Sequence, residues 1–519
     1  MDEARFLVQD LPRRERTLYL VLGFGLGYHV QQLLQRIPQS SHILILEPDG
    51  ARLSSRAAHA ANAPPRAWLS NTRLHFAALH DPAAAPDILA DSMTRLRLLS
   101  LEIFPHIPST LTAEIFYRAL LALIPQKFPS SFYNNLNLID KMPENDLLNF
   151  WANLPYSWNA APIDSLHDLW ANRPLIVVSA GPSLTGSLET LHAAGDRVLL
   201  FATGPAARIL MNQGIRADLV LSLDPFEANL GHFQGWNTAD TPLVYHHRIY
   251  RGVLPAHEGP KFCFLMQDEP PLPLSGTTAK STMMRGGSVA FSALQLAHHL
   301  GANPIIFVGQ DFAFANGHTH AAGSITDSIY DPDALPESYF QVPGIAGRTV
   351  VTNRIYYSYL VYMQDYLLNF SRHSPSVRHI NCSPIGAVVR GMEYAALDRV
   401  LAGCVPADPP FAPELIRRSL QSSPPTPHDG KRTALSRWAS DLTRILAHAS
   451  GTDEFPGLFS KFRATALYAH APVSYDDIQY LYQARYRSED HSSNSVLPTR
   501  FIGHLKCVLH LLGAAEAQV

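Results

Sequence analysis

The sequence of 519 residues has few charged residues, and its positive and negative charges nearly cancel. It has 41 Lys and Arg against 44 Asp and Glu, a net charge of −3, and charged residues make up 16% of the chain. Soluble proteins typically have ~25%. A sequence pI near 6.8 lacks the basic excess of nucleic-acid-binding proteins, so we expect no nucleic-acid partner. Because 46% of the residues are hydrophobic, a highly charged disordered chain is excluded as well.

Long hydrophobic runs and clustered cysteines are also missing. No apolar run approaches the ~20 residues that span a bilayer, and the acidic start of the sequence does not resemble a signal peptide. We therefore expect a cytoplasmic protein with no membrane partner. The cysteines are far apart, without a C-x-x-C pair, which predicts reduced, buried thiols rather than disulfides or a zinc site; they are Cys263, Cys382, Cys404 and Cys507.

The length suggests about three domains at ~150 residues each. We expect residues 1–130 to form a Rossmann-like α/β domain, because apolar runs at 18–22 and 43–46 flank a helical stretch at 28–37. Residues 131–173 read as a helical connector, and residues 174–404 as a central α/β domain. Residues 405–519 predict a helical domain, from helical periodicity at 431–449, 459–469, 473–486 and 501–512.

The central domain alternates short apolar runs with helical stretches. This order is typical of a parallel sheet covered by helices on both faces. We expect strands at 175–179, 197–202, 218–223, 243–245, 261–265, 305–308 and 377–380. We expect helices at 184–194, 206–213, 289–300 and 356–370. The fold class is therefore α/β.

The strongest motif is a strand that ends in Gly181-Pro182-Ser183. Ser183 stands where a helix N-cap is expected. The N–H groups of such a helix start attract phosphate, and in a parallel sheet they face the ligand crevice. An ordinary capped turn without a ligand fits the same residues. Thr203, before Gly204-Pro205, ends the next strand in a similar turn.

Three further segments follow the same pattern. Asp224 ends a strand and suits a ribose hydroxyl, a metal or a helix cap. Gly287 and Ser288 open the helix at 289–300, where a backbone can approach a ligand closely. Asp311 ends the strand at 305–308, and His320 follows in a polar loop. An imidazole there suits a general base, although an exposed histidine without a role also fits.

Two other chemistries have weaker support. Gly23-x-Gly25-x-Gly27 with Glu47 about twenty residues later fits a dinucleotide or adenosylmethionine site, but tight packing of a turn explains it equally. Metal-ligand spacing is missing, so we expect no required cofactor; two strand-end carboxylates leave room for Mg²⁺ on a phosphate.

The central motifs resemble the domain named after MptE, the archaeal hydroxymethylpterin diphosphokinase. The matching segments are Ser179 to Leu184, Ala217 to Pro225, Gly286 to Gly301, and Gly309-Gln310-Asp311-Phe312 with His320. With its flanking blocks, the chain resembles the motility-associated factor (Maf) glycosyltransferases, whose central domain is similar to bacterial sialyltransferases. The resemblance implies transfer of a nonulosonic acid, pseudaminic or legionaminic, from a CMP-activated donor to Ser or Thr of flagellin.

The resemblance also assigns roles. Catalysis falls to His320 or Asp311, and donor binding to Gly181, Pro182, Ser183, Thr203, Asp224, Gly287, Ser288, Asn381 and Ser383. Two positions depart from the pattern: Ala180 stands where sialyltransferases often have Asn, and Pro384 where Maf proteins usually have Glu. The alternatives are an ATP- and Mg²⁺-dependent hydroxymethylpterin diphosphokinase, with Asp224 and Asp311 as metal ligands, and a non-catalytic nucleotide-binding relative.

Overall fold

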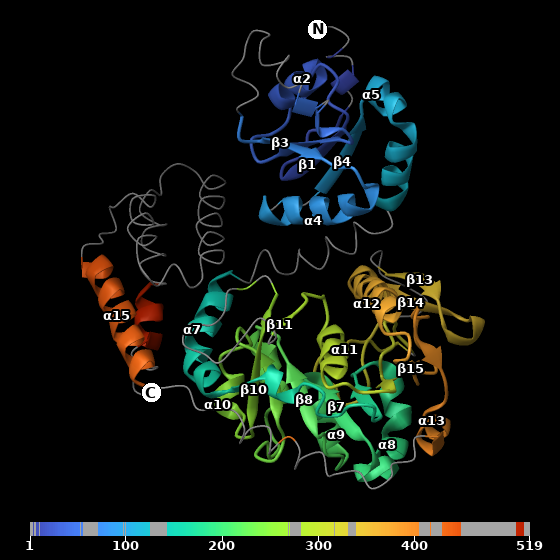
Figure 1. The fold of residues 1–519 in the computed structure, drawn as a ribbon, viewed down its shortest axis with the longest axis vertical. Coiled ribbons are helices and arrows are strands. Elements are labelled where there is room, and N and C mark those ends of the chain that lie inside the picture. The colour runs from blue at the N-terminus through green and yellow to red at the C-terminus, as the bar shows by residue number, and fades with distance from the viewer. Residues whose placement is uncertain are drawn as a thin grey trace. The chain divides into compact units, whose positions relative to one another are not determined.

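The computed structural model divides into two compact units, residues 1–140 and 141–519, which are described separately (Figure 1). It describes residues 4, 7–9, 11–51, 53–54, 71–96, 98, 100–124, 143–267, 269, 282–315, 317–330, 339–403, 416, 428–447 and 505–512.

The first unit contains a four-stranded parallel sheet in the order β3-β2-β1-β4. Its apolar runs form the central strands because both faces of the sheet are covered, and every residue of β1 is buried. This is the Rossmann-like arrangement that the sequence predicts for this unit. The elements are β1 (Thr17–Leu22), α2 (Tyr28–Arg36), β2 (His42–Glu47), β3 (Leu74–Ala78), α4 (Ala85–Arg95), β4 (Ser100–Pro105) and α5 (Ile107–Thr112).

The second unit is built on a ten-stranded sheet. The strand order is β11-β10-β9-β8-β7-β6-β12-β15-β16, β5 pairs with β10, and the pairings are parallel. The predicted α/β fold class is thus confirmed. The strands are β5 (Ala161–Pro162), β6 (Leu175–Val178), β7 (Leu199–Thr203), β8 (Leu219–Ser222), β9 (Leu243–His246), β10 (Lys261–Met266), β11 (Thr282–Met283), β12 (Ile305–Val308), β15 (His379–Asn381) and β16 (Glu393–Tyr394).

Strand β6 lies between β7 and β12 in this sheet. From β6 the chain adds β7 to β10 in one direction and then returns to add β12 on the other side. In doubly wound sheets such a reversal of strand order opens a crevice at the carboxyl ends of the strands, where ligands bind. The segments that follow β6 and β12 begin with the motifs at Gly181 and Asp311, so the topology brings these two motifs to one place.

Helices cover both faces of this sheet because its side chains alternate between two cores. Ile176 and Val178 of β6 belong to a core with α7, α8 and α9, whereas Leu175 and Val177 belong to a core with α11 and α12. The helices are α7 (Pro143–Asn159), α8 (Leu188–Ala194), α9 (Gly204–Asn212), α10 (Val253–Ala256), α11 (Val289–His299), α12 (Arg354–His373), α13 (Leu397–Gly403) and α15 (His428–Ala447).

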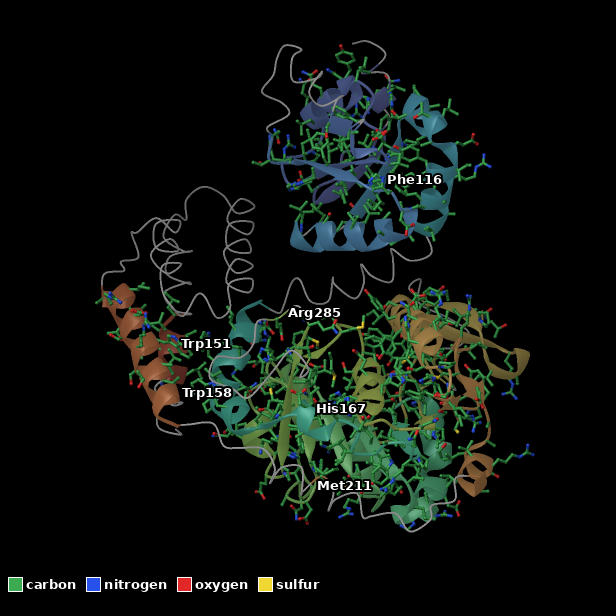
Figure 2. All side chains as sticks on the ribbon, in the orientation of Figure 1. Phe116, Trp151, Trp158, His167, Met211 and Arg285 are labelled. Atoms are coloured by element: carbon green, nitrogen blue, oxygen red, sulfur yellow. The ribbon has the colours of Figure 1, made fainter. Side chains whose placement is uncertain are left out.

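Helix α15 packs on α7. Trp438 of α15 makes an edge contact with Trp151 at 5.6 Å between ring centroids, and lies 6.3 Å from Trp158; Figure 2 labels both α7 rings. Helix α15 and the helical residues 505–512 both contribute side chains to the core on that face of the sheet. The predicted helical stretches at 459–469 and 473–486 lie outside the described residues.

Several local expectations need correction. The stretch at 184–194 is split into a 3₁₀ helix, η4 (Pro182–Ser187), and α8. The connector at 131–173, expected to be helical, contains the long helix α7. An antiparallel pair, β13 (Tyr339–Pro343) and β14 (Thr349–Asn353), was not predicted. The expectation of a buried thiol is wrong for Cys507, which is exposed, whereas Cys263 and Cys382 are buried. Among the helices that the structure describes, none has the length and hydropathy to cross a membrane.

Candidate functional site

A pocket lies at the carboxyl ends of β6, β7 and β12, where the strand order reverses. It has a volume of about 150 Å³ and is open to solvent. The loops after these three strands, the start of α11 and one face of α12 line it. The lining residues are 179–181, 203, 205, 288–290, 309–313, 320, 356 and 359. Five predicted site residues are among them: Gly181, Thr203, Ser288, Asp311 and His320.

Asp311 holds the turn that follows β6. Its Oδ2 accepts a hydrogen bond from the Ser183 N–H at 2.8 Å, and its Oδ1 accepts one from the Ser183 hydroxyl at 2.5 Å. The prediction that Ser183 caps the helix is wrong, because η4 begins at Pro182 with Gly181 as its N-cap residue. Burial raises the pKa of Asp311, and the hydrogen bonds from Ser183 and Ser383 oppose this.

Backbones approach each other unusually closely beside this carboxylate. A Cβ on Gly181 would lie 2.4 Å from the Gly309 carbonyl oxygen and 2.6 Å from Asp311 Oδ2. Gly309 has φ 71°, and a Cβ there would lie 2.0 Å from the Ser179 carbonyl oxygen. Only glycine fits at either position. The sequence motif contained Gly309, but it gave no sign that two glycines face each other.

The amides of this turn are already in use, which decides where an anion can bind. The Gly181 N–H donates to the Gly309 carbonyl, the Ser183 N–H to Asp311, and the Leu184 N–H to the Gly181 carbonyl; Pro182 has no N–H. The pocket instead receives the first turns of α9 and α11, and the leading N–H groups of a helix have no acceptor within it. Of these, Pro205 of α9 has no N–H, and the Phe291 N–H of α11 donates to Ser288. Helix starts of this kind bind phosphate.

The start of α11 matches its predicted form. The Ser288 hydroxyl oxygen accepts a hydrogen bond from the Phe291 N–H at 3.2 Å and so caps the helix. Gly287 adjoins it but does not line the pocket. Thr203 is the N-cap residue of α9, and its hydroxyl donates to the Val178 carbonyl at 3.3 Å. Ser288 and Thr203 therefore mark two helix starts at one pocket.

Asn381 and Ser383 support the pocket from behind. The Asn381 side-chain amide donates to the Gln310 carbonyl at 3.2 Å, and the Ser383 hydroxyl oxygen accepts from the Gln310 N–H at 3.1 Å. The Ser179 hydroxyl donates to the Gln310 side chain at 2.7 Å. Because neither Asn381 nor Ser383 lines the pocket, we expect them to position residues 310–311 rather than to contact a ligand.

Asp224 lies outside the pocket lining but acts on it electrostatically. Its Oδ1 accepts a hydrogen bond from the Phe226 N–H at 2.9 Å, a local turn of the kind that Asp often stabilises. Desolvation raises the pKa of Asp224 and the Phe226 N–H opposes this. Burial, together with the charge of Asp224, raises the pKa of Tyr359 in the pocket to about 12.

His320 is the histidine among the lining residues of the pocket. Its Nε2 lies 2.9 Å from the Tyr356 hydroxyl and its Nδ1 lies 3.0 Å from the Thr319 hydroxyl. Burial lowers the pKa of His320, and the nearby charge of Asp327 opposes this. The imidazole is therefore mostly neutral at pH 7 and able to accept a proton.

Sequence reasoning missed the two tyrosines that face this pocket from α12. Tyr356 and Tyr359 are three residues apart, so they lie on one side of the helix. The sequence predicts the helix, but it contains several tyrosines there and does not say which of them face the pocket. The Asn353 side chain caps α12 and accepts from the Tyr356 N–H at 2.8 Å. This cap fixes the position of the Tyr356 backbone in the first turn of the helix.

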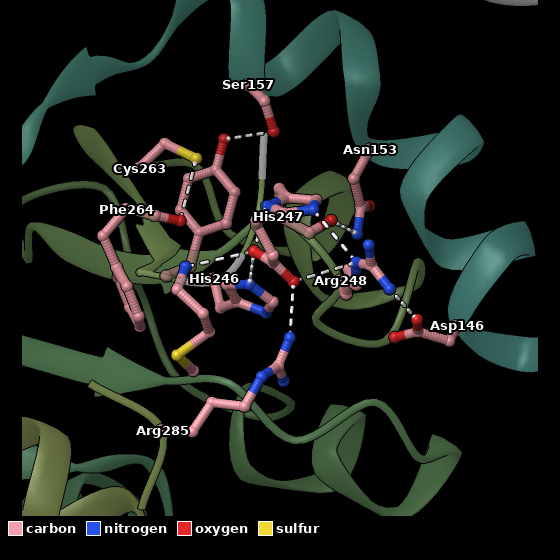
Figure 3. Close-up of polar contacts among 12 residues, drawn as sticks. Asp146, Asn153, Ser157, His246, His247, Arg248, Cys263, Phe264 and Arg285 are labelled. Atoms are coloured by element: carbon pink, nitrogen blue, oxygen red, sulfur yellow. Dashed lines mark hydrogen bonds and ion pairs between the residues drawn. The ribbon is translucent and has the colours of Figure 1, made fainter. Parts of the chain in front are cut away.

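The described residues contain one cluster with metal-ligand composition: His246, His247 and Glu269 (Figure 3). Glu269 Oε2 lies 2.8 Å from His246 Nε2, and Oε1 lies within 3.3 Å of the side chains of Arg248 and Arg285. Burial opposes ionisation of Glu269, but His246, His247 and Arg248 outweigh it and hold its pKa well below the usual value. The positive charges of Arg248 and Arg285 already neutralise the charge of this carboxylate.

The protonation of His247 also disfavours a cation there. Arg248 Nε donates to His247 Nε2 at 3.1 Å, which leaves the ring proton on Nδ1 of the neutral form. A metal ion bound at Nδ1 would need a lone pair on that nitrogen, which carries the proton instead. The predicted Mg²⁺ ligands fit no better, because both oxygens of Asp311 are bound by Ser183 and Asp224 does not line the pocket.

The glycine-rich loop of the first unit is filled by its own side chains. A Cβ on Gly23 would lie 2.1 Å from Ser109 Cβ, and one on Gly25 would lie 2.5 Å from the His106 ring. Glu47 is buried, and its Oε2 accepts from the Phe24 N–H at 3.0 Å. These contacts favour the packing interpretation of this loop over a dinucleotide or adenosylmethionine site.

Taken together, the second unit is a doubly wound α/β protein with a pocket of the kind that binds nucleotides: helix starts at the strand-order reversal and one histidine. Residues 148–317 match the family model described as 6-hydroxymethylpterin diphosphokinase MptE-like. The solved structure of a Maf glycosyltransferase from Magnetospirillum magneticum AMB-1 is similar, with TM-score 0.50 and 14% identity, over 98% of this chain and 80% of that chain. No curated protein matches the sequence. The chain thus contains an MptE-like domain and has the fold of a Maf glycosyltransferase, which confirms the resemblance that the motifs indicated.

Proposed function

We propose that the protein is a cytoplasmic glycosyltransferase that moves a nonulosonic acid, pseudaminic or legionaminic, from a CMP-activated donor to Ser or Thr of flagellin. The observation that carries this proposal is the pocket at the strand-order reversal, where two helix starts and His320 meet in a chain with a Maf-type fold. The identity of the sugar and of the acceptor comes from the resemblance of the motifs.

The donor phosphate binds at the first turns of α9 and α11 in this proposal, near Thr203 and Ser288. Fixed N–H dipoles stabilise the negative charge that develops as the phosphate leaves, which is the largest contribution in many transfer reactions. The turn at Gly181 shapes the wall of the pocket, since its amides are used within the protein. The low proportion of charged residues fits recognition of phosphate by backbone amides.

His320 is the favoured base for the acceptor hydroxyl. It lines the pocket and burial lowers its pKa, which keeps the imidazole neutral and basic. Asp311 was the other candidate, but both of its oxygens accept hydrogen bonds from Ser183. Asp311 is accordingly proposed as a residue that positions the turn, with Ser383 and Asn381 behind it. Proton removal by a positioned base contributes ~10²–10⁴-fold to such rates.

The test is mass spectrometry of flagellin co-expressed with this protein and a nonulosonate pathway. We expect Ser and Thr adducts of the sugar's mass, and their loss in His320→Ala. His373→Ala is the control, because His373 is exposed at the end of α12. Absence of the adduct with the wild-type protein, or an undiminished adduct with His320→Ala, would contradict the proposal.

The match of residues 148–317 to an MptE-like model favours pterin diphosphate synthesis as the second candidate. That reaction needs ATP and Mg²⁺, with Asp224 and Asp311 as the metal ligands, and the hydrogen bonds of Asp311 speak against it. Formation of hydroxymethyl-dihydropterin diphosphate from ATP would support it over glycosyl transfer. A thermal shift with CMP but neither activity would indicate the third alternative, a non-catalytic nucleotide-binding relative.

A further inference from the structure

Both ring nitrogens of His320 already have hydrogen-bond partners. Nε2 lies 2.9 Å from the Tyr356 hydroxyl, and Nδ1 lies 3.0 Å from the Thr319 hydroxyl. His320 and Tyr356 both line the pocket. Nε2 therefore faces a residue of the pocket lining, whereas Nδ1 faces Thr319, which does not line the pocket.

The contacts of Thr319 set the direction of this chain of hydrogen bonds. Its hydroxyl oxygen accepts from the Ser328 N–H at 2.8 Å and lies 3.4 Å from Asp327 Oδ1. Hydrogen bonds from His318 and from the His320 N–H outweigh burial and lower the pKa of Asp327. With the Thr319 hydroxyl donating to this carboxylate, its oxygen is left to accept the Nδ1 proton of His320, and this tautomer presents the lone pair of Nε2 to Tyr356.

Tyr356 is held firmly and stays protonated. Its ring packs 5.0 Å from Phe314 and 6.1 Å from Tyr359 between centroids, and its N–H bonds to the cap residue Asn353. Burial raises the pKa of Tyr356, and the nearby Tyr359 adds to this. A lasting phenolate is thus excluded, and a hydroxyl that gains one proton while losing another remains neutral.

We propose that Tyr356 is a second catalytic residue, whose hydroxyl contacts the acceptor oxygen and relays its proton to Nε2 of His320. This inference rests on the proposed glycosyl transfer. The acceptor O–H bond breaks as its oxygen bonds to the anomeric carbon, and the bond from that carbon to phosphate breaks with its electron pair on CMP. The acceptor proton moves to the Tyr356 oxygen, the Tyr356 proton moves to His320, and the imidazolium later releases it to water.

The kinetic test is Tyr356→Phe, which removes a single oxygen. With CMP-pseudaminic or CMP-legionaminic acid and flagellin, we expect kcat to fall about 100-fold with little change in the donor KM. A plot of the wild-type rate against the fraction of D₂O in the solvent should be curved, because two protons move together. The same plot for the variant should be a straight line. Tyr357→Phe is the control, because Tyr357 packs on Phe340 outside the pocket. Wild-type kcat in Tyr356→Phe, or a straight wild-type line, would overturn the relay.

A second measurement needs no turnover and separates this inference from the proposed function. In ¹⁵N-histidine NMR spectra of the full chain, His320 should be the Nδ1–H tautomer, with an Nε2 resonance that shifts in Tyr356→Phe and stays in Tyr357→Phe. If the wild-type protein transfers no sugar, the proposed function fails, but these spectra still show whether the Tyr356 hydroxyl is hydrogen-bonded to Nε2 of His320. An Nε2 resonance equal in the wild type and Tyr356→Phe would refute the hydrogen bond on which the relay depends.

Discussion

Substitution of Gly181 by alanine probes the close approach on which the pocket wall depends. The new methyl group would lie 2.4 Å from the Gly309 carbonyl oxygen and 2.6 Å from Asp311 Oδ2. Gly186, inside the 3₁₀ helix η4 that Gly181 caps, is the matched control, because a Cβ on Gly186 meets nothing within 4 Å. The two substitutions add the same methyl group at the N-cap and in the interior of one helix, and only the methyl group at Gly181 has a neighbour within 4 Å.

The size of the effect follows from these contacts. Ordinary van der Waals contact begins near 3.4 Å, so Gly181 and Gly309 must separate by roughly 1 Å, which breaks the hydrogen bond between them. Overpacking of this kind costs about 1–3 kcal/mol of folding stability. A displacement of ~1 Å near reacting groups lowers rates by about 100-fold. Gly186→Ala should instead gain up to ~1 kcal/mol, because alanine restricts the unfolded chain.

The assay is thermal unfolding of the full chain with and without CMP, followed by sugar transfer to flagellin. We expect Gly181→Ala to melt below the wild type, to lose the stabilisation by CMP and to transfer about 100-fold more slowly. Gly186→Ala should keep both properties. Equal melting and equal CMP stabilisation in the two variants would refute the steric argument, whatever the catalytic rates.

Three further predictions concern other groups. Asp311→Ala should lower the unfolding free energy by about 1–3 kcal/mol for each Ser183 donor left without an acceptor, and Asp311→Asn by less, as urea unfolding can show; a wild-type midpoint for Asp311→Ala would contradict this. Burial lowers the pKa of His298 to about 3 and that of His379 to about 4. The unfolded chain therefore binds protons that the folded one does not, and each ring should cost about 2 kcal/mol of stability at pH 5 relative to pH 7. His298→Phe should reduce this difference between unfolding curves at the two pH values, and an unchanged difference would argue against buried neutral rings. Cys507 should react rapidly with a thiol reagent in the folded protein, and Cys507→Ser should remove that reactive equivalent; an undiminished fast phase would contradict its exposure.

The central strands could be predicted from the sequence because they are buried on both faces. Continuous apolar runs such as 305–308 have few alternatives in an α/β chain, and β12 has those bounds. The connector at 131–173 is predicted as helical, but without the bounds of α7, since its 17 residues include Pro155 and alternate Asn with aromatic residues. Its Asn149 and Asn153 side chains donate to backbone carbonyls around residues 247–249, a packing role that composition does not reveal.

The site was predictable in position but not in the orientation of its side chains. Asp311 was expected at a strand end, and it is there, but the sequence does not say that it points beneath a neighbouring turn and binds Ser183. Tyr356 was hidden for a similar reason, because its role depends on a helix packed against a loop 36 residues earlier in the chain. Contacts between distant segments are set by tertiary structure, and local patterns do not encode them.

The bond between Ser183 and Asp311 joins residues 128 positions apart, and this separation has a consequence for synthesis. At ~5–20 residues per second, the turn after β6 leaves the ribosome roughly ten seconds before the carboxylate that fixes it. Any nascent or truncated chain that stops short of residue 305 has a turn without its anchor and a sheet without β12. The lining of the pocket also includes residues of α12, so it is complete only after residue 359 has been made.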